Sequence, residues 1–170
     1  IPDLVLIGTT EGIFRTENNF ESFSFSQTGN SWEYNQDYDY IEFHPINENI
    51  IYASSYNDDS KIYVSTDAGL SFQPSGSISG NGSNIKLSIS AACQDCVYVG
   101  SSDGVWKSEN LGQNFTLISN PEIDNYGAFA VSDVDTNYML LGDIDTHRST
   151  DGGLTFNQAT YWATGNANYD

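Results

Sequence analysis

Apolar and polar residues alternate one by one along most of this chain, in short runs separated by polar segments. The runs Lys61–Ser65 and Cys96–Ser101 are examples, and Val, Ile and Tyr are frequent in such runs. A period of two places successive side chains on opposite faces of a β-strand, and these residue types favour strands. No window of helical length repeats its apolar residues about every 3.6 positions. The pattern therefore predicts an all-β protein.

The expected strands fall into four groups along the chain. We expect strands at residues 4–8, 12–16 and 22–26; at 38–43, 50–55, 61–65 and 71–73; at 85–90, 96–101, 104–108 and 114–118; and at 127–131, 138–142, 146–149 and 155–159. The corresponding units are residues 1–26, 38–74, 85–119 and 127–160, and residues 161–170 lead toward a further unit. Pro45 ends the strand 38–43, because proline cannot donate a hydrogen bond to a sheet.

One eight-residue segment recurs between the last two strands of every unit. It is STDGGLTF at Ser149–Phe156, STDAGLSF at Ser65–Phe72, SENLGQNF at Ser108–Phe115 and, in a degenerate copy, TENNFESF at Thr16–Phe23. All four copies have a hydroxyl first, Asp or Asn third and Phe eighth, and three have Gly fifth. The copies start 49, 43 and 41 residues apart, and one propeller blade takes about 40 to 50 residues. We therefore predict a β-propeller segment of about four four-stranded antiparallel blades, belonging to a larger propeller.

The repeated segment has the chemistry of a tight turn. A Ser or Thr hydroxyl and an Asp or Asn side chain can bond nearby backbone N–H groups, and glycine accepts a positive φ at little cost. The Phe at position eight then places an apolar side chain in the following strand. We assign a structural role, in preference to direct chemistry, to Ser65, Asp67, Gly69, Phe72, Ser108, Asn110, Gly112, Phe115, Ser149, Asp151, Gly153 and Phe156.

The pattern S-x-D-x-G-x-x-F resembles the Asp-box, or bacterial neuraminidase repeat, of β-propellers. The wider segment Cys96–Ser108 is similar to the repeat of xyloglucanase-like and sortilin-like propellers of secreted proteins. In those families the box is a structural turn at the blade periphery, away from the central site. Position eight is Phe in every copy here, where Trp is common in the families, and the first copy lacks both the acid and the Gly.

The charge of the chain limits the classes of partner that it can bind. The formal net charge is −18, from 23 acidic residues and five Lys plus Arg. Such a chain repels nucleic acid and anionic membranes, and no apolar run is long enough to span a bilayer. Three of the basic residues, Arg15, Lys107 and Arg148, directly precede a repeat, which suggests a shared structural role.

Cys93 and Cys96 are the only cysteines, and we place them in a loop between the strands 85–90 and 96–101. A disulfide suits a secreted repeat protein and is the favoured interpretation. Free thiols rank second. Zinc ranks last, because His44 and His147 are the only histidines. We therefore expect an extracellular or cell-surface protein.

The connections between units are rich in aromatic and acidic residues, and in a propeller they gather around one mouth of the central channel. Exposed aromatic rings can stack on sugars or on peptide side chains, while carboxylates bond hydroxyl groups. The alternative is that the rings fill gaps between blades. The candidates for binding a glycan or protein ligand are Trp32, Tyr34, Asp37, Asp124, Tyr126, Tyr161 and Trp162.

Enzymatic alternatives are less well supported. A sialidase needs a cluster of arginines, and only Arg15 and Arg148 are present, so we disfavour it. An inverting hydrolase of the xyloglucanase-like type needs two carboxylates about 6.5 to 9.5 Å apart. Asp37, Asp39, Asp124 and Asp170 could supply one, but no motif selects a pair, and no catalytic residue is assigned.

Two acidic clusters raise the question of calcium. Asp143 and Asp145 with Asp151, and the run Asn57–Ser60, offer oxygen ligands without the spacing of an EF-hand. Solvated acids are the favoured explanation, so we predict no cofactor and assign no metal site. We also expect the remaining blades to come from the same chain or from another chain. The sequence thus predicts a binding or scaffolding propeller module, with part of a glycoside hydrolase as the alternative.

Overall fold

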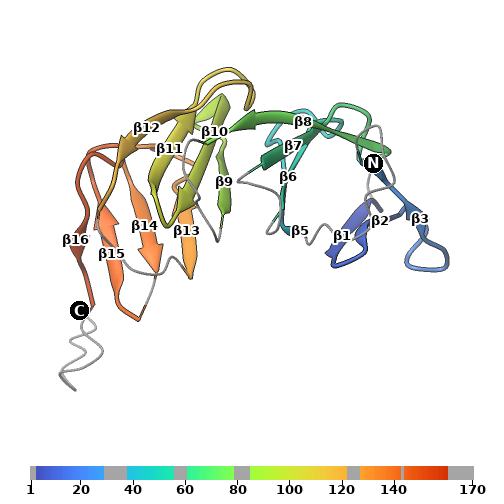
Figure 1. Ribbon diagram of the computed structural model, residues 1–170, viewed down its shortest axis with the longest axis horizontal. Helices are drawn as coiled ribbons and strands as arrows, with labels where there is room; N and C mark the ends of the chain where they lie inside the picture. Colours follow the sequence, from blue (N-terminus) through green and yellow to red (C-terminus); the bar gives the residue numbers. More distant parts are fainter. Residues whose placement is uncertain are drawn as a thin grey trace.

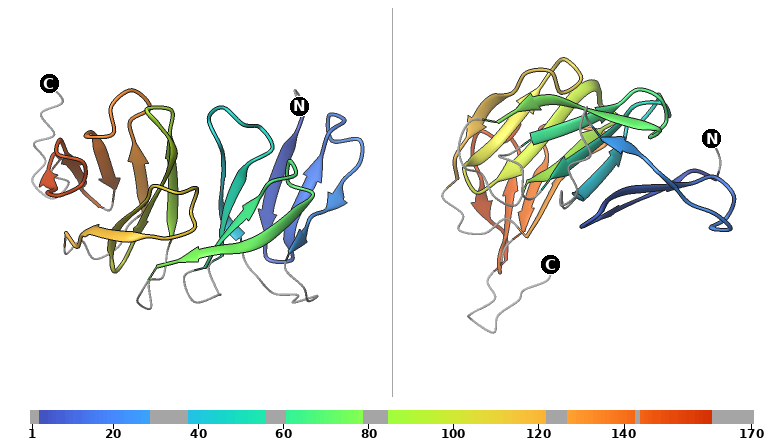
Figure 2. Two further views of the ribbon diagram at one scale, coloured as in Figure 1. Left: turned by 90° about the horizontal axis from the view of Figure 1, so that it is seen from above. Right: turned by 45° about the vertical axis from the view of Figure 1, so that its right-hand side comes forward.

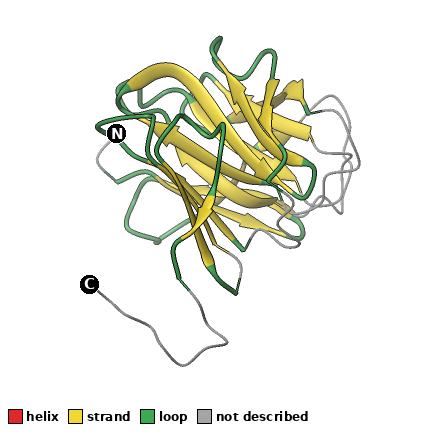
Figure 3. Cartoon of the chain, turned by 90° about the vertical axis from the view of Figure 1, so that its left-hand side faces the viewer, coloured by secondary structure: helices red, strands yellow, loops and turns green. Residues whose placement is uncertain are grey.

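The computed structural model describes residues 3–28, 38–55, 61–78, 85–121, 127–142 and 144–160. Within these ranges every regular element is a β-strand, as the alternating pattern predicts. The strands form four sheets that follow one another along the chain, and we call these sheets blades one to four (Figures 1 and 3).

Most strand bounds lie within one residue of the expected ones, but the last strand of each blade differs by two to four residues at one end. Blade one contains β1 (Val5–Thr9), β2 (Gly12–Thr16) and β3 (Ser24–Phe25). Blade two contains β5 (Tyr38–Phe43), β6 (Ile51–Ser55), β7 (Lys61–Ser65) and β8 (Ser71–Ser77), joined by β4 (Gln27–Thr28). Blade three contains β9 (Lys86–Ser90), β10 (Cys93–Ser101), β11 (Gly104–Ser108) and β12 (Thr116–Ser119). Blade four contains β13 (Ala128–Val131), β14 (Met139–Gly142), β15 (Thr146–Ser149) and β16 (Asn157–Gln158).

Each blade is an antiparallel sheet in which sequential strands are neighbours. The blades stand side by side in an arc from blade one, on the right of Figure 1, to blade four on the left. Figure 2 shows the same succession from above. The exception to antiparallel pairing is β4, which leaves blade one and pairs in parallel with β8 through Gln27 and Ser71. The strand pattern did not predict this link, because it joins two distant segments.

The cysteine loop expected from the sequence is wrong in one respect. Strand β10 begins at Cys93, so both cysteines lie within a strand and not in a loop between strands. The pairing of β9 and β10 shifts register between Cys93 and Val97, which marks a β-bulge. The alternation of apolar residues fails across a bulge, and for this reason the sequence pattern predicts a start three residues later.

The apolar core lies between the blades, in three clusters. The cluster between blades one and two includes Ile13, Ile51 and Phe72. The cluster between blades two and three includes Tyr52, Ile62, Leu87, Val97 and Trp106. The cluster between blades three and four includes Tyr98, Phe129, Met139 and Leu141. Because both faces of an inner blade are covered, its strands are buried almost throughout, as in β6 and β11.

Candidate functional site

The two ends of each blade differ in what they contain. Lys86 at the start of β9 pairs with Gly100, beside the hairpin turn between β10 and β11. The inner strands therefore start at the same end as these hairpins, and we call this the mouth end.

The eight-residue repeats lie at the opposite end of each blade, which we call the turn end. There the fourth repeat residue donates its N–H to the first hairpin of its own blade: Ala68 to Asn49 O, Leu111 to Asp95 O and Gly152 to Asn137 O, at 2.9 to 3.1 Å.

The first residue of each repeat organises the turn through its hydroxyl. Ser65 Oγ donates to Asp67 Oδ1 at 2.8 Å and accepts from the N–H of Gly69 at 2.8 Å. The same pair of bonds joins Ser108 to Asn110 and Gly112, both at 2.9 Å. In blade four Ser149 makes these bonds at 2.7 and 2.9 Å. All three serines are completely buried, so these hydroxyls are part of the folded framework.

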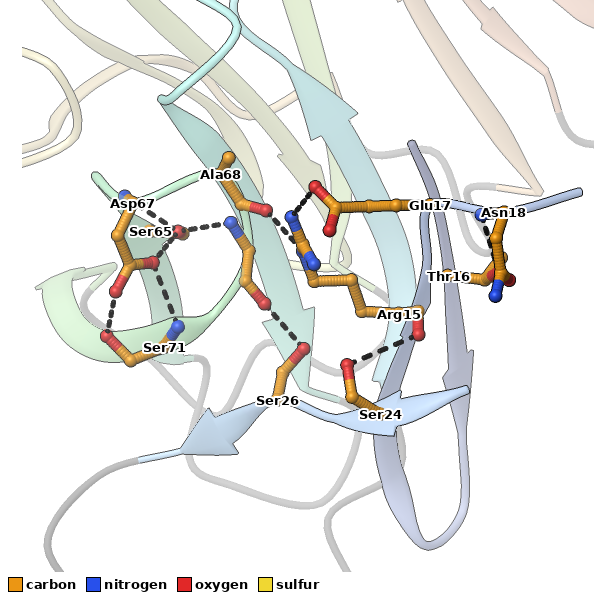
Figure 4. A network of polar contacts seen from close by, with 11 residues as sticks. Arg15, Thr16, Glu17, Asn18, Ser24, Ser26, Ser65, Asp67, Ala68 and Ser71 are labelled. Atoms are coloured by element: carbon orange, nitrogen blue, oxygen red, sulfur yellow. Dashed lines mark hydrogen bonds and ion pairs between the residues drawn. The ribbon is translucent and has the colours of Figure 1, made fainter. Parts of the chain in front are cut away.

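The third residue is bonded from the far side of the turn by the seventh, which the sequence pattern did not single out. Asp67 accepts from both the N–H and the hydroxyl of Ser71, at 2.9 and 2.6 Å, as Figure 4 shows. Asp151 accepts the equivalent bonds from Thr155 at 3.0 and 2.6 Å. In blade three the acid is replaced by Asn110, and residue seven is Asn114, which keeps only the N–H bond. The signal in the sequence is a short polar residue at position seven of every copy.

These bonds determine how the carboxyl groups titrate. The hydroxyl and N–H of Thr155, and then the hydroxyl of Ser149, lower the pKa of Asp151 from 3.8 to about 2. For Asp67, burial raises the pKa, but the hydrogen bonds from Ser71 and Ser65 outweigh it, so the pKa is lowered. Both groups are held as carboxylates by structural hydrogen bonds, which leaves them poorly suited to general acid catalysis.

Glycine at position five has the positive φ expected of it: 79°, 82° and 87° at Gly69, Gly112 and Gly153. Position four is also left-handed, with φ of 58° at Ala68 and 57° at Leu111. Two successive left-handed residues make a type I′ kind of turn, which matches the twist of two antiparallel strands. The sequence did not reveal the second such position, because it is occupied by alanine and leucine in two of the copies.

Neighbouring blades are joined by a hydrogen bond that recurs at every described junction. Ser26 Oγ donates to Gly69 O at 2.6 Å, Ser75 Oγ to Gly112 O at 3.0 Å, and Ser119 Oγ to Gly153 O at 2.5 Å. In each case a serine on the outer part of one blade holds the repeat turn of the next. These serines follow the start of their own repeat by ten or eleven residues, a regularity that the strand pattern does not reveal.

The basic residues before the repeats do not share a single role. Arg15 is buried, and its Nε donates to Ala68 O of blade two at 2.8 Å while its guanidinium pairs with Glu17 at 2.5 Å (Figure 4). Lys107 pairs with Glu109 at 2.7 Å. These partners lower the pKa of Glu17 and of Glu109. Arg148 is exposed. Because Arg15 is occupied in a blade junction, it cannot hold a substrate carboxylate.

The seven residues expected to bind a ligand, Trp32, Tyr34, Asp37, Asp124, Tyr126, Tyr161 and Trp162, lie outside the described residues. The described part of the mouth end is the start of the inner strands. There Lys86 is 9% exposed, and its Nζ lies 4.5 Å from the centre of the Tyr40 ring, a cation–π contact. Among the described residues Lys86 has no carboxylate partner, which is unusual in so acidic a chain.

The carboxylates considered for hydrolysis lie outside the described part of the chain: Asp37, Asp124 and Asp170, and the side chain of Asp39. One acid on an inner strand is perturbed: burial, and then the charge of Asp133, raises the pKa of Glu42. Glu42 lies near the end of β5, and Asp133 follows the end of β13. Both acids are therefore at the turn end, and Glu42 is far from the mouth end.

Cys93 and Cys96 are joined by a disulfide, with their Cα atoms 5.3 Å apart. The bridge spans the bulge that carries Asp95, whose carbonyl accepts from Leu111 in the third repeat. The side chains of the described part contain no group of three His, Cys, Asp or Glu residues arranged to hold a metal. Of the residues considered for calcium, Asp143 and the whole run Asn57–Ser60 fall outside it. The same part contains no helix suited to crossing a membrane.

No family description matches this chain, and no curated protein matches it. Several solved structures match it. An ancestral GH74 enzyme superposes with a TM-score of 0.73 at 21% identity, over 92% of this chain and 24% of that one. The GH74 xyloglucanase from Xanthomonas campestris gives 0.70 at 17% identity, over 94% and 23%. The protein YCF48 bound to D1 peptide gives 0.63 at 16% identity, over 92% and 50%.

At these identities the likeness concerns the fold and not the activity. The chain spans about a quarter of the GH74 structures and half of the YCF48 structure. Four successive antiparallel sheets, buried apolar layers between them and these neighbours agree on one architecture. The chain folds as consecutive blades of a β-propeller.

Proposed function

We propose that this chain is part of a secreted or cell-surface propeller that binds a glycan or protein ligand at its mouth end, and that its repeats are structural Asp-boxes. The observation that carries the proposal is the separation of polar groups between the two ends. At the turn end the repeat hydroxyls and carboxylates are consumed by hydrogen bonds within the turn. At the mouth end Lys86 lacks an anionic partner among the described residues.

Three further features support a binding role. In the sequence, Trp32, Trp162 and several tyrosines and acids lie in the segments that separate or follow the blades. The disulfide suits an oxidising, extracellular compartment. The structural neighbour YCF48 was solved with a peptide bound, so the same fold serves peptide binding in that protein.

The test is a binding screen on a glycan microarray and a peptide array, followed by titration of the best probe against variants. We expect Trp32→Ala or Trp162→Ala to weaken binding by at least about tenfold, since loss of a stacked ring costs about 1 to 3 kcal/mol. Phe20→Ala is the matched control, because Phe20 is 57% exposed but lies in the first repeat at the turn end. Equal losses from Phe20→Ala and the tryptophan variants would contradict a site at the mouth.

The alternative is that the chain forms part of a glycoside hydrolase of the xyloglucanase-like type. The observation that favours it is the fold shared with two GH74 structures. If it is correct, the protein releases reducing ends from xyloglucan, and replacing one of the candidate acids Asp37, Asp39, Asp124 or Asp170 by Asn abolishes the release without changing the urea unfolding midpoint. A binding module releases none, and its affinity falls with the tryptophan variants instead.

A further inference from the structure

The third repeat contains an asparagine whose side chain the turn does not use. In the second and fourth repeats, position seven is Ser71 or Thr155, and its hydroxyl donates to the acid at position three. In the third repeat, position seven is Asn114, whose backbone N–H donates to Asn110 Oδ1 at 3.0 Å. Within the described residues, the carboxamide of Asn114 takes no part in the bonds that close this turn. The turn therefore holds the backbone of Asn114 and leaves its side chain free for other chemistry.

Asn114 begins a short sequence with the chemistry of N-glycosylation. Asn114, Phe115 and Thr116 match the pattern N-x-S/T without proline in the middle, which is the acceptor of N-linked glycans on secreted proteins. The chain has one other match, Asn81-Gly82-Ser83, and it lies outside the described residues. The third repeat is thus the repeat whose departure from the common pattern creates an acceptor.

The fold exposes both ends of this sequence. Asn114 and Thr116 are exposed, whereas Phe115 between them is partly buried and packs against the core cluster between blades two and three. Asn114 precedes β12, which begins at Thr116 and forms the outer edge of blade three (Figure 1). A glycan on Asn114 therefore extends into solvent from a turn, and it displaces neither a strand nor a core side chain.

The same turn is bonded to the segment that contains the disulfide. Leu111 of the third repeat donates its N–H to Asp95 O at 2.9 Å, and Asp95 lies between Cys93 and Cys96. Disulfides persist in proteins of oxidising compartments, and N-linked glycans occur on surface turns of secreted proteins. A disulfide and a glycan acceptor in adjacent segments of one blade suit the same secretory route.

We propose that Asn114 is the attachment site of an N-linked glycan in the secreted protein. The donor is an oligosaccharide carried on a lipid pyrophosphate. The carboxamide nitrogen of Asn114 bonds to the anomeric carbon of the first sugar, while the bond from that carbon to the pyrophosphate oxygen breaks and its electron pair stays on the oxygen. The nitrogen gives up one proton to a base. The proposal rests on the secreted localisation in the proposed function, and not on the ligand at the mouth end.

The test is mass spectrometry of the 170-residue chain, secreted from cultured eukaryotic cells behind a cleavable signal peptide. Asn81→Gln is present throughout, so that the other N-x-S/T sequence gives no signal. We expect a glycan on the peptide that contains Asn114, and we expect peptide N-glycosidase to remove it and convert Asn114 to Asp. Because Asn114 is exposed, the enzyme should release the glycan from the folded protein without denaturation.

Two variants and a control identify the acceptor. Asn114→Gln and Thr116→Val should each lose the glycan completely, because the first removes the accepting group and the second removes the hydroxyl that the pattern requires. Asn114→Gln keeps the bond from its backbone N–H to Asn110, so the urea midpoint of the deglycosylated protein should not change. The matched control is Asn157→Gln, which should keep the glycan. Asn157 is also exposed, but the residue two positions later is Ala159, which has no hydroxyl.

Three results would overturn the proposal. One is an unmodified Asn114 in a secreted chain whose Cys93–Cys96 disulfide has formed, because that chain has passed through the oxidising compartment. Another is a glycan that persists in Asn114→Gln. The third is a glycan that the enzyme releases only after denaturation, which would contradict its position on an exposed turn. Failure of the proposed binding function is a separate result, because the array screen measures it on the deglycosylated protein.

Discussion

At the residue scale, the repeat turn combines two left-handed residues with a carboxylate that is bonded on both of its oxygens. Asp67 and Asp151 each accept from a hydroxyl at position one and from both groups of residue seven. Asn110 takes this place in the third repeat, where it accepts from the hydroxyl of Ser108 and the N–H of Asn114 and carries no charge. The acid is therefore a device for closing the turn, and it makes the turn sensitive to pH.

The first prediction concerns acid unfolding. The folded-state pKa values of Asp67 and Asp151 lie below the ordinary value of 3.8, so their stabilising effect is complete above about pH 4. It is lost as the pH falls toward about 2, the pKa of Asp151 in the folded protein. We expect the double variant Asp67→Asn, Asp151→Asn to flatten the dependence of the urea midpoint on pH between 4 and 2.

In the double variant the urea midpoint should still fall somewhat with pH, because basic partners also lower the pKa values of Glu17 and Glu109. Glu42 has a raised pKa and acts with the opposite sign, above about pH 4.5, so it does not interfere. An unchanged slope in the double variant would mean that the two carboxylates do not close the turns as described.

The second prediction compares two adjacent glycines of one turn. Gly152 and Gly153 have φ of 75° and 87°, so alanine at either position costs about 1 kcal/mol in backbone strain. A Cβ at Gly152 meets nothing nearer than 3.6 Å, whereas at Gly153 it would lie 2.9 Å from Met139 Sδ. We expect Gly153→Ala to reduce the unfolding free energy by about 1 to 3 kcal/mol more than Gly152→Ala. Urea unfolding measures both, and equal losses would rule out the packing of Met139 against the turn.

At the element scale, the blades are joined by apolar layers and by one serine at each described junction. The carbonyl of Gly69 receives Ser26 Oγ, while that of Gly112 receives both Ser75 Oγ and the N–H of Gly76. This difference matters because a buried carbonyl left without a donor costs more than a shared hydrogen bond.

The third prediction follows from that difference. Ser26→Ala leaves Gly69 O without its donor and should cost about 1 to 3 kcal/mol of unfolding free energy. Ser75→Ala leaves Gly112 O bonded to Gly76 and should cost about 0.5 to 1 kcal/mol. Chemical denaturation of the two variants against the parent provides the comparison. A larger loss for Ser75→Ala would contradict the proposed role of these serines in joining the blades.

Much of this element structure could be predicted from the sequence, because the turn chemistry and the alternation are local. The positive φ of Gly69, Gly112 and Gly153 followed from residue type alone. The left-handed Ala68 and Leu111 did not, since nothing in those residue types marks the conformation. The pairing of Gln27 with Ser71 and the bond from Ser26 to Gly69 were also missed, because each joins segments more than 40 residues apart.

At the scale of the whole molecule, the chain has a turn end where the repeats stabilise the blades, and a mouth end where the inner strands start. The connections between blades are expected at the mouth end. The disulfide at Cys93–Cys96 and all four repeats lie at the turn end. The sequence could name aromatic residues for the mouth, such as Trp32 and Trp162, but not their neighbours. A stacking ring and a ring that fills a gap between blades have the same local pattern.

The division between the two ends is tested most directly by the stability of three Trp→Ala variants in urea. Trp106 is buried between blades two and three, so Trp106→Ala should cost about 3 to 5 kcal/mol. If Trp32 and Trp162 serve a ligand and not the core, their replacement by alanine should change the unfolding free energy by no more than about 0.5 kcal/mol. A loss at either position comparable to that of Trp106→Ala would show that these rings fill gaps between blades, and would contradict a binding site at the mouth.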